Sequence, residues 1–351
     1  MKNNFIPDHR HIVDAAWNKP TDRLPLYEHN ISDRVMERIT GREFRHLADG
    51  DVKDKEEYFR NYCGFFKDMG YDAVSFEGCV TSILPGGGCL GSSTQEPAIR
   101  DMADFEKYPW DELPGLYFDA FAPYFTALGS AMPPGMKAVG GVGNGIFECA
   151  QDLTGYINLC FISADDPELY EALFRKVGEV ALTIWTRFMK EFGELYCVLR
   201  AGDDMGFKTN SLLSADDIRR HVIPPYAEII RLVHGYGKPF LLHSCGQIEN
   251  VMPDLIHAAR IDAKHSNEDI ISPFSHWVHR YGKEIGNFGG IDLDVLCQIK
   301  ANEVKDHVYN ILDACGTTDG IAFSTGNSIP DYVPLNNYVA MLEAVRTYRG
   351  E

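Results

Sequence analysis

The sequence predicts an α/β protein built as a (β/α)8 barrel, also called a TIM barrel. Short β-rich runs alternate with long helical patterns along all 351 residues, as expected for βα units repeated around a parallel sheet, and the length suits one such barrel. Eight runs have the composition of strands: 24–28, 72–76, 137–142, 196–200, 239–243, 261–264, 284–288 and 320–324. We expect residues 1–20 to form an N-terminal helical extension and residues 21–351 to form a single catalytic barrel domain.

Two of the helices between these strands are well defined by their sequence. One begins at Asp166 and Pro167, because proline is favoured at the first helical position. The other begins at Ser214, and the proline pair at 224–225 predicts a kink inside it. The glycine-rich stretch 83–94 is expected to be a mobile loop over one barrel mouth.

Composition limits the classes of function. Hydrophobic residues make up 45% of the chain and the formal net charge is −18, so the protein can bury a large core while its surface repels a phosphate backbone. The nine cysteines have no regular spacing, which argues against a disulfide framework, and no apolar run reaches the roughly 20 residues that span a bilayer. We expect a cytoplasmic protein with no nucleic-acid or membrane partner. A homodimer is compatible with these features.

Polar side chains gather where the predicted strands end. Barrel enzymes place their function at the C-terminal ends of the strands, and charged groups on strands buried on both faces are costly unless a site uses them. The catalytic candidates at these ends, as proton carriers, metal ligands or substrate-orienting groups, are Asp204, Asp203, Glu148 and Glu77. The structural alternative for adjacent acids is a loop cap, in which the carboxylate accepts hydrogen bonds from backbone N–H groups.

The most specific short motif is His243-Ser244-Cys245-Gly246. Residues two apart on an extended segment point to the same side, so the imidazole and the thiolate can converge on one ion. Such an N/S pair suits zinc, and a catalytic zinc would take one further protein ligand. A buried histidine beside an inert thiol carries about equal weight, because the motif is short.

Several segments together resemble the uroporphyrinogen decarboxylase superfamily of TIM barrels. They follow the order and spacing of that superfamily over about residues 130–349. The segments are 203–206 (DDMG), Ser214, 224–226 (PPY), 242–246 (LHSCG), 289–292 (GGID), 324–330 (STGNSIP) and 333–336 (VPLN). The branch that carries HxCG is similar to the cobalamin-dependent methyltransferases.

The resemblance implies a set of site residues. In the coenzyme M members of that branch, zinc is held by the His and the Cys of HxC and by a later Cys. His243 and Cys245 match the first two ligands, whereas Asn327, a poor zinc ligand, stands at the third position. This departure favours a different third ligand, an oxygen from Glu77, Glu148 or Asp204. The residues expected to contact substrate are Asn144, Asn327, Tyr332 and His265.

The resemblance also implies an activity. We expect a corrinoid-dependent methyltransferase that moves a methyl group from a small donor, in particular a methoxylated aromatic, to the cobalt of a separate corrinoid protein. The cobamide would come with that partner, because nothing in the sequence resembles a corrinoid-binding module. A Lewis-acid zinc or a carboxylic acid would stabilise the developing oxyanion.

Three alternatives to this activity stay open. The first is methyl transfer to a thiol such as coenzyme M. The second is porphyrinogen decarboxylation. The run 24–30 is acidic at the place where the decarboxylase carries arginines, and this difference disfavours that activity. The third is a non-catalytic barrel that binds a corrinoid or an aromatic.

Overall fold

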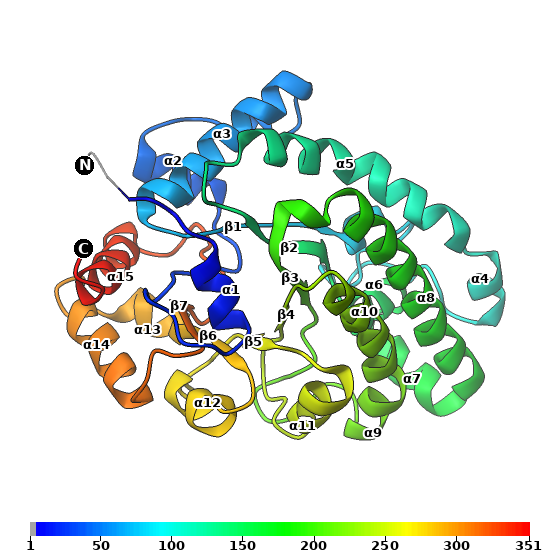
Figure 1. The fold of residues 1–351 in the computed structure, drawn as a ribbon. Helices are drawn as coiled ribbons and strands as arrows, with labels where there is room; N and C mark the ends of the chain where they lie inside the picture. Colours follow the sequence, from blue (N-terminus) through cyan, green and yellow to red (C-terminus); the bar gives the residue numbers. More distant parts are fainter. Residues whose placement is uncertain (1–4) are drawn as a thin grey trace.

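Seven parallel strands pair in chain order in the computed structural model, which describes residues 5–351 (Figure 1). The strands from β2 to β7 are buried along their whole length, because helices cover the curled sheet on its outside. The strands are β1 (Val74–Cys79), β2 (Ala138–Gly143), β3 (Tyr196–Gly202), β4 (Phe240–His243), β5 (Ala263–His265), β6 (Gly286–Ile291) and β7 (Ile321–Thr325). Seven of the eight predicted strands are confirmed, with ends shifted by a few residues.

The remaining prediction, a strand at 24–28, is wrong. This segment forms only an isolated parallel bridge, in which Leu26 faces Phe323 of β7. Tyr27 N donates to Phe323 O at 2.9 Å, and Phe323 N donates to Pro25 O at 2.9 Å. Pro25 has no N–H with which to extend a ladder. The segment nevertheless continues the curl of the sheet beyond β7.

Helices alternate with the strands and surround the sheet (Figure 1). They are α1 (Arg10–Ala16), α2 (Asp33–Thr40), α3 (Val52–Met69), α4 (Met102–Lys107), α5 (Leu113–Ala131), α6 (Ile146–Thr154), α7 (Tyr156–Asp165), α8 (Pro167–Glu191), α9 (Ala215–Asp217), α10 (Ile223–Gly235), α11 (Met252–Asp254), α12 (Phe274–Tyr281), α13 (Leu293–Gln298), α14 (Val304–Cys315) and α15 (Leu335–Tyr348). None of them, within residues 5–351, is both long and apolar enough to cross a membrane.

The two helices defined by the sequence are confirmed. The side chain of Asp166 accepts from Leu169 N at 3.0 Å at the start of α8. Ser214 caps the second helix, which runs through α9 and α10 and is interrupted by a π-helical segment, Ile218–Val222, that is separated from the proline pair by one residue. Prolines lack the N–H groups that a regular ladder needs, and a local π turn accommodates the break.

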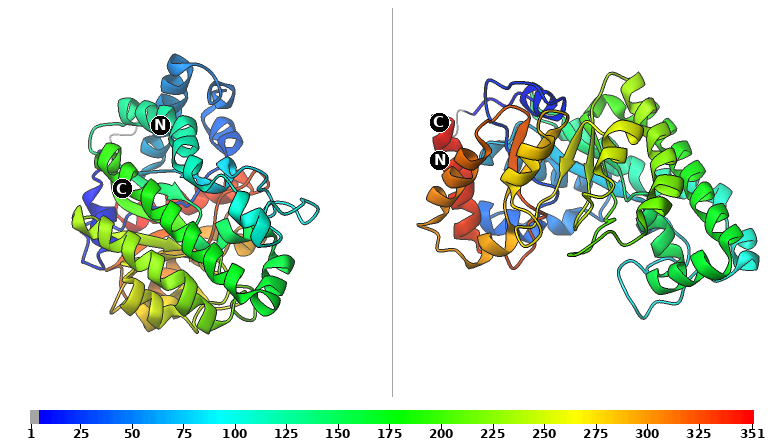
Figure 2. Two further views of the ribbon diagram at one scale, coloured as in Figure 1. Left: turned by 90° about the vertical axis from the view of Figure 1, so that its right-hand side faces the viewer. Right: turned by 90° about the horizontal axis from the view of Figure 1, so that it is seen from below.

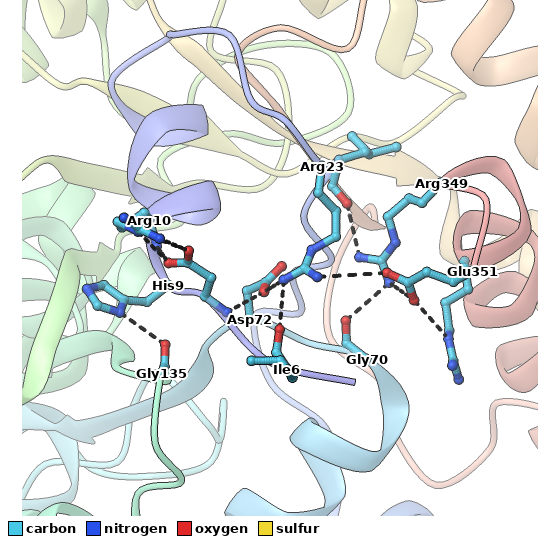
Figure 3. Close-up of polar contacts among 12 residues, drawn as sticks. Ile6, His9, Arg10, Arg23, Gly70, Asp72, Gly135, Arg349 and Glu351 are labelled. Atoms are coloured by element: carbon cyan, nitrogen blue, oxygen red, sulfur yellow. Dashed lines mark hydrogen bonds and ion pairs between the residues drawn. The ribbon is translucent and has the colours of Figure 1, made fainter. Parts of the chain in front are cut away.

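The N-terminal side of the sheet is closed by α1, which contacts β3, β6 and β7 (Figure 1). Ile12 and Ala15 are fully buried there, among inward residues of the strands such as Val198 and Phe288. Polar contacts near both chain ends reinforce this side (Figure 3), including the ion pair of Arg23 with Asp72. The opposite side of the sheet, where the strands end, is left to loops.

The glycine-rich loop projects on the side of the sheet opposite α1 (Figure 2). It is anchored to α6, because the side chain of Asp152 accepts from Gly88 N at 2.9 Å and from Leu90 N at 3.0 Å. A cavity of about 670 Å³ separates part of the loop from α7. The loop is therefore tied to the α6–α7 region on the side of the sheet where the strands end, and the mobility expected of it stays a prediction.

Candidate functional site

Three of the predicted residues converge at the ends of β3 and β4. Gly202 and His243 face each other in the register of these two strands, so the residues that follow them lie side by side. The ligand atoms of Asp204, His243 and Cys245 all lie within 4.8 Å of one another. His243 Nε2 is 3.5 Å from Cys245 Sγ and 3.5 Å from Asp204 Oδ1.

These separations fit the ligands of one tetrahedral ion. With ordinary zinc bond lengths, a nitrogen and a sulfur ligand lie about 3.6 Å apart, and a nitrogen and an oxygen ligand lie about 3.4 Å apart. The side chain of Asp204 is 44% exposed, whereas that of His243 is 6% exposed. A metal held here would therefore be anchored from within the sheet and open toward the loops.

A second group of histidines lies behind this cluster. The ring nitrogens of His29, His243 and His265 also approach within 4.8 Å of one another. However, the Nδ1 atoms of His243 and His265 are 2.7 Å apart, which is shorter than the about 3.3 Å expected between two nitrogen ligands of one zinc. This contact is a hydrogen bond, so His265 supports His243 from behind, and its contact with substrate stays a prediction.

Burial disfavours the protonated form of all three histidines. Burial, together with the charge of Arg200, lowers the pKa of His243 to about 3. Burial lowers the pKa of His29 and of His265 well below the usual value. A neutral imidazole keeps a lone pair with which to bind a metal.

The Cys245 thiol is held by polar neighbours. Asn327 Nδ2 lies 3.2 Å from Cys245 Sγ, and Ser266 Oγ lies 3.8 Å from it. Burial, and after it the carboxylate of Asp204, raises the pKa of Cys245 above its usual value. A thiolate is therefore favoured here only when a cation lies beside it.

Asp203 is a structural residue in this arrangement. It is fully buried, and its carboxylate accepts from Phe147 N at 3.2 Å, from Glu148 N at 2.9 Å and from Tyr226 Oη at 3.1 Å. The contacts with Phe147 N and Glu148 N supply acceptors for backbone N–H groups in the first turn of α6. The loop-cap alternative describes Asp203 better than the catalytic role expected from its position.

Glu148 and Asn144 form a pair beside Asp204. Asn144 Nδ2 donates to Glu148 Oε2 at 2.8 Å, and Asp204 N donates to Glu148 Oε1 at 3.2 Å. Asn144 Oδ1 accepts from Thr81 Oγ1 at 2.8 Å. This contact fixes the orientation of the Asn144 amide, so that its nitrogen faces Glu148. Burial, and then the charge of Asp203, raises the pKa of Glu148 to about 8.

Glu77 lies apart from the cluster of Asp204, His243 and Cys245 and pairs with Arg200, a residue that could not be placed from the sequence. Arg200 Nη2 is 2.8 Å from Glu77 Oε2, and Arg200 also donates to Tyr27 Oη at 2.8 Å and to His29 O at 2.9 Å. A charged side chain inside a buried parallel strand was the available signal for Arg200.

Two cavities adjoin the cluster. The first, of about 330 Å³, is lined by His29, Glu77 and Arg200 among others, and the His29 ring stacks on His243 with centroids 3.8 Å apart. The second, of about 530 Å³, is lined by Asn327 and Tyr332. Tyr332 is 71% exposed, so it belongs to the rim of the site.

Comparisons with known proteins agree with this fold. A model of the family described as Uroporphyrinogen decarboxylase (URO-D) matches residues 8–348. A methyltransferase from Methanosarcina mazei has a similar fold, with a TM-score of 0.71 and 16% sequence identity over 96% of this chain and 98% of that chain. A protein described as a vitamin-B12-independent methionine synthase from Listeria monocytogenes aligns with a TM-score of 0.49 and 10% identity over 99% of this chain and 100% of that chain. No curated protein sequence matches the chain.

Proposed function

The chain belongs to the uroporphyrinogen decarboxylase (URO-D) family, and on that premise we propose that it is a methyltransferase that moves a methyl group from a small donor to the corrinoid of a separate protein. The observation that carries the proposal is the convergence of Asp204, His243 and Cys245. The likeness in fold to the Methanosarcina mazei methyltransferase is consistent with it. Decarboxylation of a polycarboxylate is less well supported, because Arg200 is already paired with Glu77.

Zinc is the ion that this donor set would hold. A thiolate, an imidazole and a carboxylate together are typical of zinc sites, and three protein ligands leave one position open. When bound, zinc would supply a Lewis acid that stabilises negative charge on the atom that loses the methyl group. His243 and Cys245 would hold it from the end of β4, and Asp204 would hold it from the loop after β3.

The methyl donor is proposed to bind in the cavity of about 330 Å³ beside His29. That volume is at the lower end of small-molecule sites and suits a single substituted aromatic ring. Tyr58, Tyr62 and Phe76 contribute aromatic surface to its walls. Because His29 stacks on His243, only one ring separates this cavity from the metal ligands.

Glu148 is the proposed proton carrier. The oxygen of an ether is a basic leaving group, so its release is favoured by a proton. With a pKa of about 8, Glu148 holds a proton at pH 7, and its hydrogen bonds with Asp204 N and Asn144 keep it next to the metal cluster. Replacement of Glu148 by Gln would remove this proton and keep the size of the side chain, at the loss of one of the two hydrogen bonds that Glu148 accepts.

The corrinoid is proposed to approach from the open side of the site. The cavity of about 530 Å³ lined by Asn327 and Tyr332 lies on that side. The net charge of −18 would favour a partner with a basic docking face.

The proposal is tested by anaerobic incubation of the zinc-loaded protein with free cob(I)alamin and a panel of methoxylated aromatics, with release of the phenol as the readout. We expect at least one donor to be demethylated. We expect Cys245→Ala to abolish the reaction and Glu148→Gln to slow it by roughly 10²-fold or more. Cys160→Ala, which removes an exposed thiol on α7, is the matched control. Equal rates in Cys245→Ala and Cys160→Ala would contradict the proposal.

A further inference from the structure

We propose that His265 is a positioning residue that fixes the tautomer of His243, so that Nε2 of His243 carries no proton and faces Cys245 and Asp204. The proposed function enters only through the metal that this nitrogen would bind. The tautomer itself is a property of the protein without metal. The tautomer of His243 follows from three steps, the first of which is a contact at the end of β7.

The first contact fixes the proton on His265. His265 Nε2 lies 3.1 Å from Thr325 O, and a carbonyl oxygen can only accept. Thr325 is itself held in place, because its N donates to Glu28 Oε1 at 3.1 Å and its Oγ1 lies 2.6 Å from Glu28 Oε2. His265 Nε2 therefore carries a hydrogen.

The second step is that His265 carries no other proton. The ring is fully buried and packs edge-on against Tyr27, with centroids 5.2 Å apart. Among residues 5–351 no carboxylate forms an ion pair with it, and the nearby charges of Lys264 and Arg200 are positive. A second proton would bury an unpaired cation, so Nδ1 of His265 is a bare acceptor.

The third contact transfers this constraint to His243. The 2.7 Å separation of the two Nδ1 atoms requires one hydrogen between them, and His243 must supply it because His265 does not. A neutral His243 then has a bare Nε2. This nitrogen is 3.5 Å from Asp204 Oδ1, well beyond the 2.7–2.9 Å or so of a charge-assisted hydrogen bond, as expected if no hydrogen lies between them.

The chain of hydrogen bonds from Thr325 through His265 to His243, here called the relay, has a consequence for metal binding. Histidines that bind metals usually donate their second ring N–H to a neighbouring acceptor, and loss of that acceptor costs roughly 10–100-fold in metal affinity. Here the acceptor is a second histidine, whose own orientation depends on the backbone carbonyl of Thr325 at the end of β7. His265 thus prepares His243 without touching the metal.

The experiment is long-range ¹H–¹⁵N NMR of the imidazole rings in metal-free protein labelled at histidine, with the His243 and His265 signals assigned from variants. The same variants are then titrated with Zn²⁺ against a chromophoric chelator. His265→Phe keeps a ring but removes both nitrogens, and His265→Asn returns an oxygen near the place of Nδ1. His29→Phe is the matched control, because His29 stacks on His243 without a described hydrogen bond to it.

We expect wild-type His243 to be protonated at Nδ1 and bare at Nε2, and His265 to be protonated at Nε2. In His265→Phe, His243 should shift toward the Nε2–H tautomer and zinc affinity should fall by roughly 10–100-fold. His265→Asn should recover part of both, and His29→Phe should retain the wild-type tautomer. A wild-type His243 protonated at Nε2 would overturn the inference, whether or not His265→Phe folds. The predicted tautomer in a protein that binds no zinc would support the relay and count against the proposed function alone.

Discussion

Asn327 donates a hydrogen bond to the sulfur of Cys245, with Nδ2 3.2 Å from Sγ. The orientation of the amide is fixed, because Asn327 Oδ1 accepts from Ser328 N at 2.8 Å and the nitrogen must then face the sulfur. The backbone oxygen of Asn327 accepts from Thr325 Oγ1 at 2.8 Å. Asn327, which stands where the resemblance to the methyltransferases implies a third thiolate, is therefore a donor that would stabilise a Cys245 thiolate.

Removal of this donor should weaken the metal site. A hydrogen bond to a charged group contributes roughly 1.5–3 kcal/mol, so we expect Asn327→Ala to lower zinc affinity about tenfold or more. Competition with a chromophoric chelator measures the change. Ser328→Ala is the control, because Ser328 uses its backbone N–H in this contact. Unchanged affinity in Asn327→Ala would contradict the role given to the amide.

Asp203 should matter for stability and not for metal binding. Asp203→Ala leaves Phe147 N, Glu148 N and Tyr226 Oη without their shared acceptor. The cost of such buried unpaired groups is roughly 1–3 kcal/mol each, so the free energy of unfolding should fall by about 3 kcal/mol. Chemical denaturation measures this loss, and zinc content should stay that of the wild type. A stable variant that has lost its zinc would show that Asp203 has the catalytic or ligand role instead.

The contribution of Glu28 to the free energy of unfolding should fall as pH rises toward 8. Burial raises the pKa of Glu28 from 4.5 to about 8, so between these values the folded state holds a proton that the unfolded state has released. The stabilisation from this proton is complete below pH 4.5 and is lost as pH rises through 8. The contacts of Thr325 agree with a protonated Glu28. The Thr325 hydroxyl lies 2.6 Å from Glu28 Oε2 and 2.8 Å from Asn327 O. Because it has one hydrogen and donates it to Asn327 O, the hydrogen in the contact with Glu28 must come from the carboxyl group.

Glu28→Gln tests this pH dependence directly. The amide retains a donor toward Thr325 but does not titrate, so denaturation between pH 5 and pH 8 should show a slope reduced by up to about 1.4 kcal/mol per pH unit. Part of the slope should remain, because the pKa of Glu148 is also raised to about 8. An identical slope in the variant and the wild type would show that Glu28 is ionised in the folded state.

Much of the fold could be predicted from the sequence, because apolar runs and helix caps are local signals. The segment 24–28 has a strand-like composition, but Pro25 restricts its pairing to one bridge with β7. The proximity of His243 and Cys245 could be predicted, because alternation along an extended segment places them on one side. Their convergence with Asp204 supports the pair, and metal binding itself stays a prediction.

The roles of the other polar residues could not be predicted, because position at a strand end does not distinguish the layer that faces substrate from the layer behind it. His265 and Asn327 were expected to contact substrate, and they contact His243 and Cys245. Glu77, a candidate ligand, pairs with Arg200, which comes from a strand far along the chain. Such pairings depend on the tertiary structure.

The most direct test of the metal centre is the zinc content of the anaerobically purified protein beside its His243→Ala, Cys245→Ala, Asp204→Ala and Cys160→Ala variants. The geometry of the three ligand atoms predicts about one zinc per chain in the wild type and in Cys160→Ala. It predicts none in His243→Ala and Cys245→Ala, and a strongly reduced content in Asp204→Ala. A wild type without zinc after zinc supplementation, or zinc retained in both His243→Ala and Cys245→Ala, would contradict the metal centre.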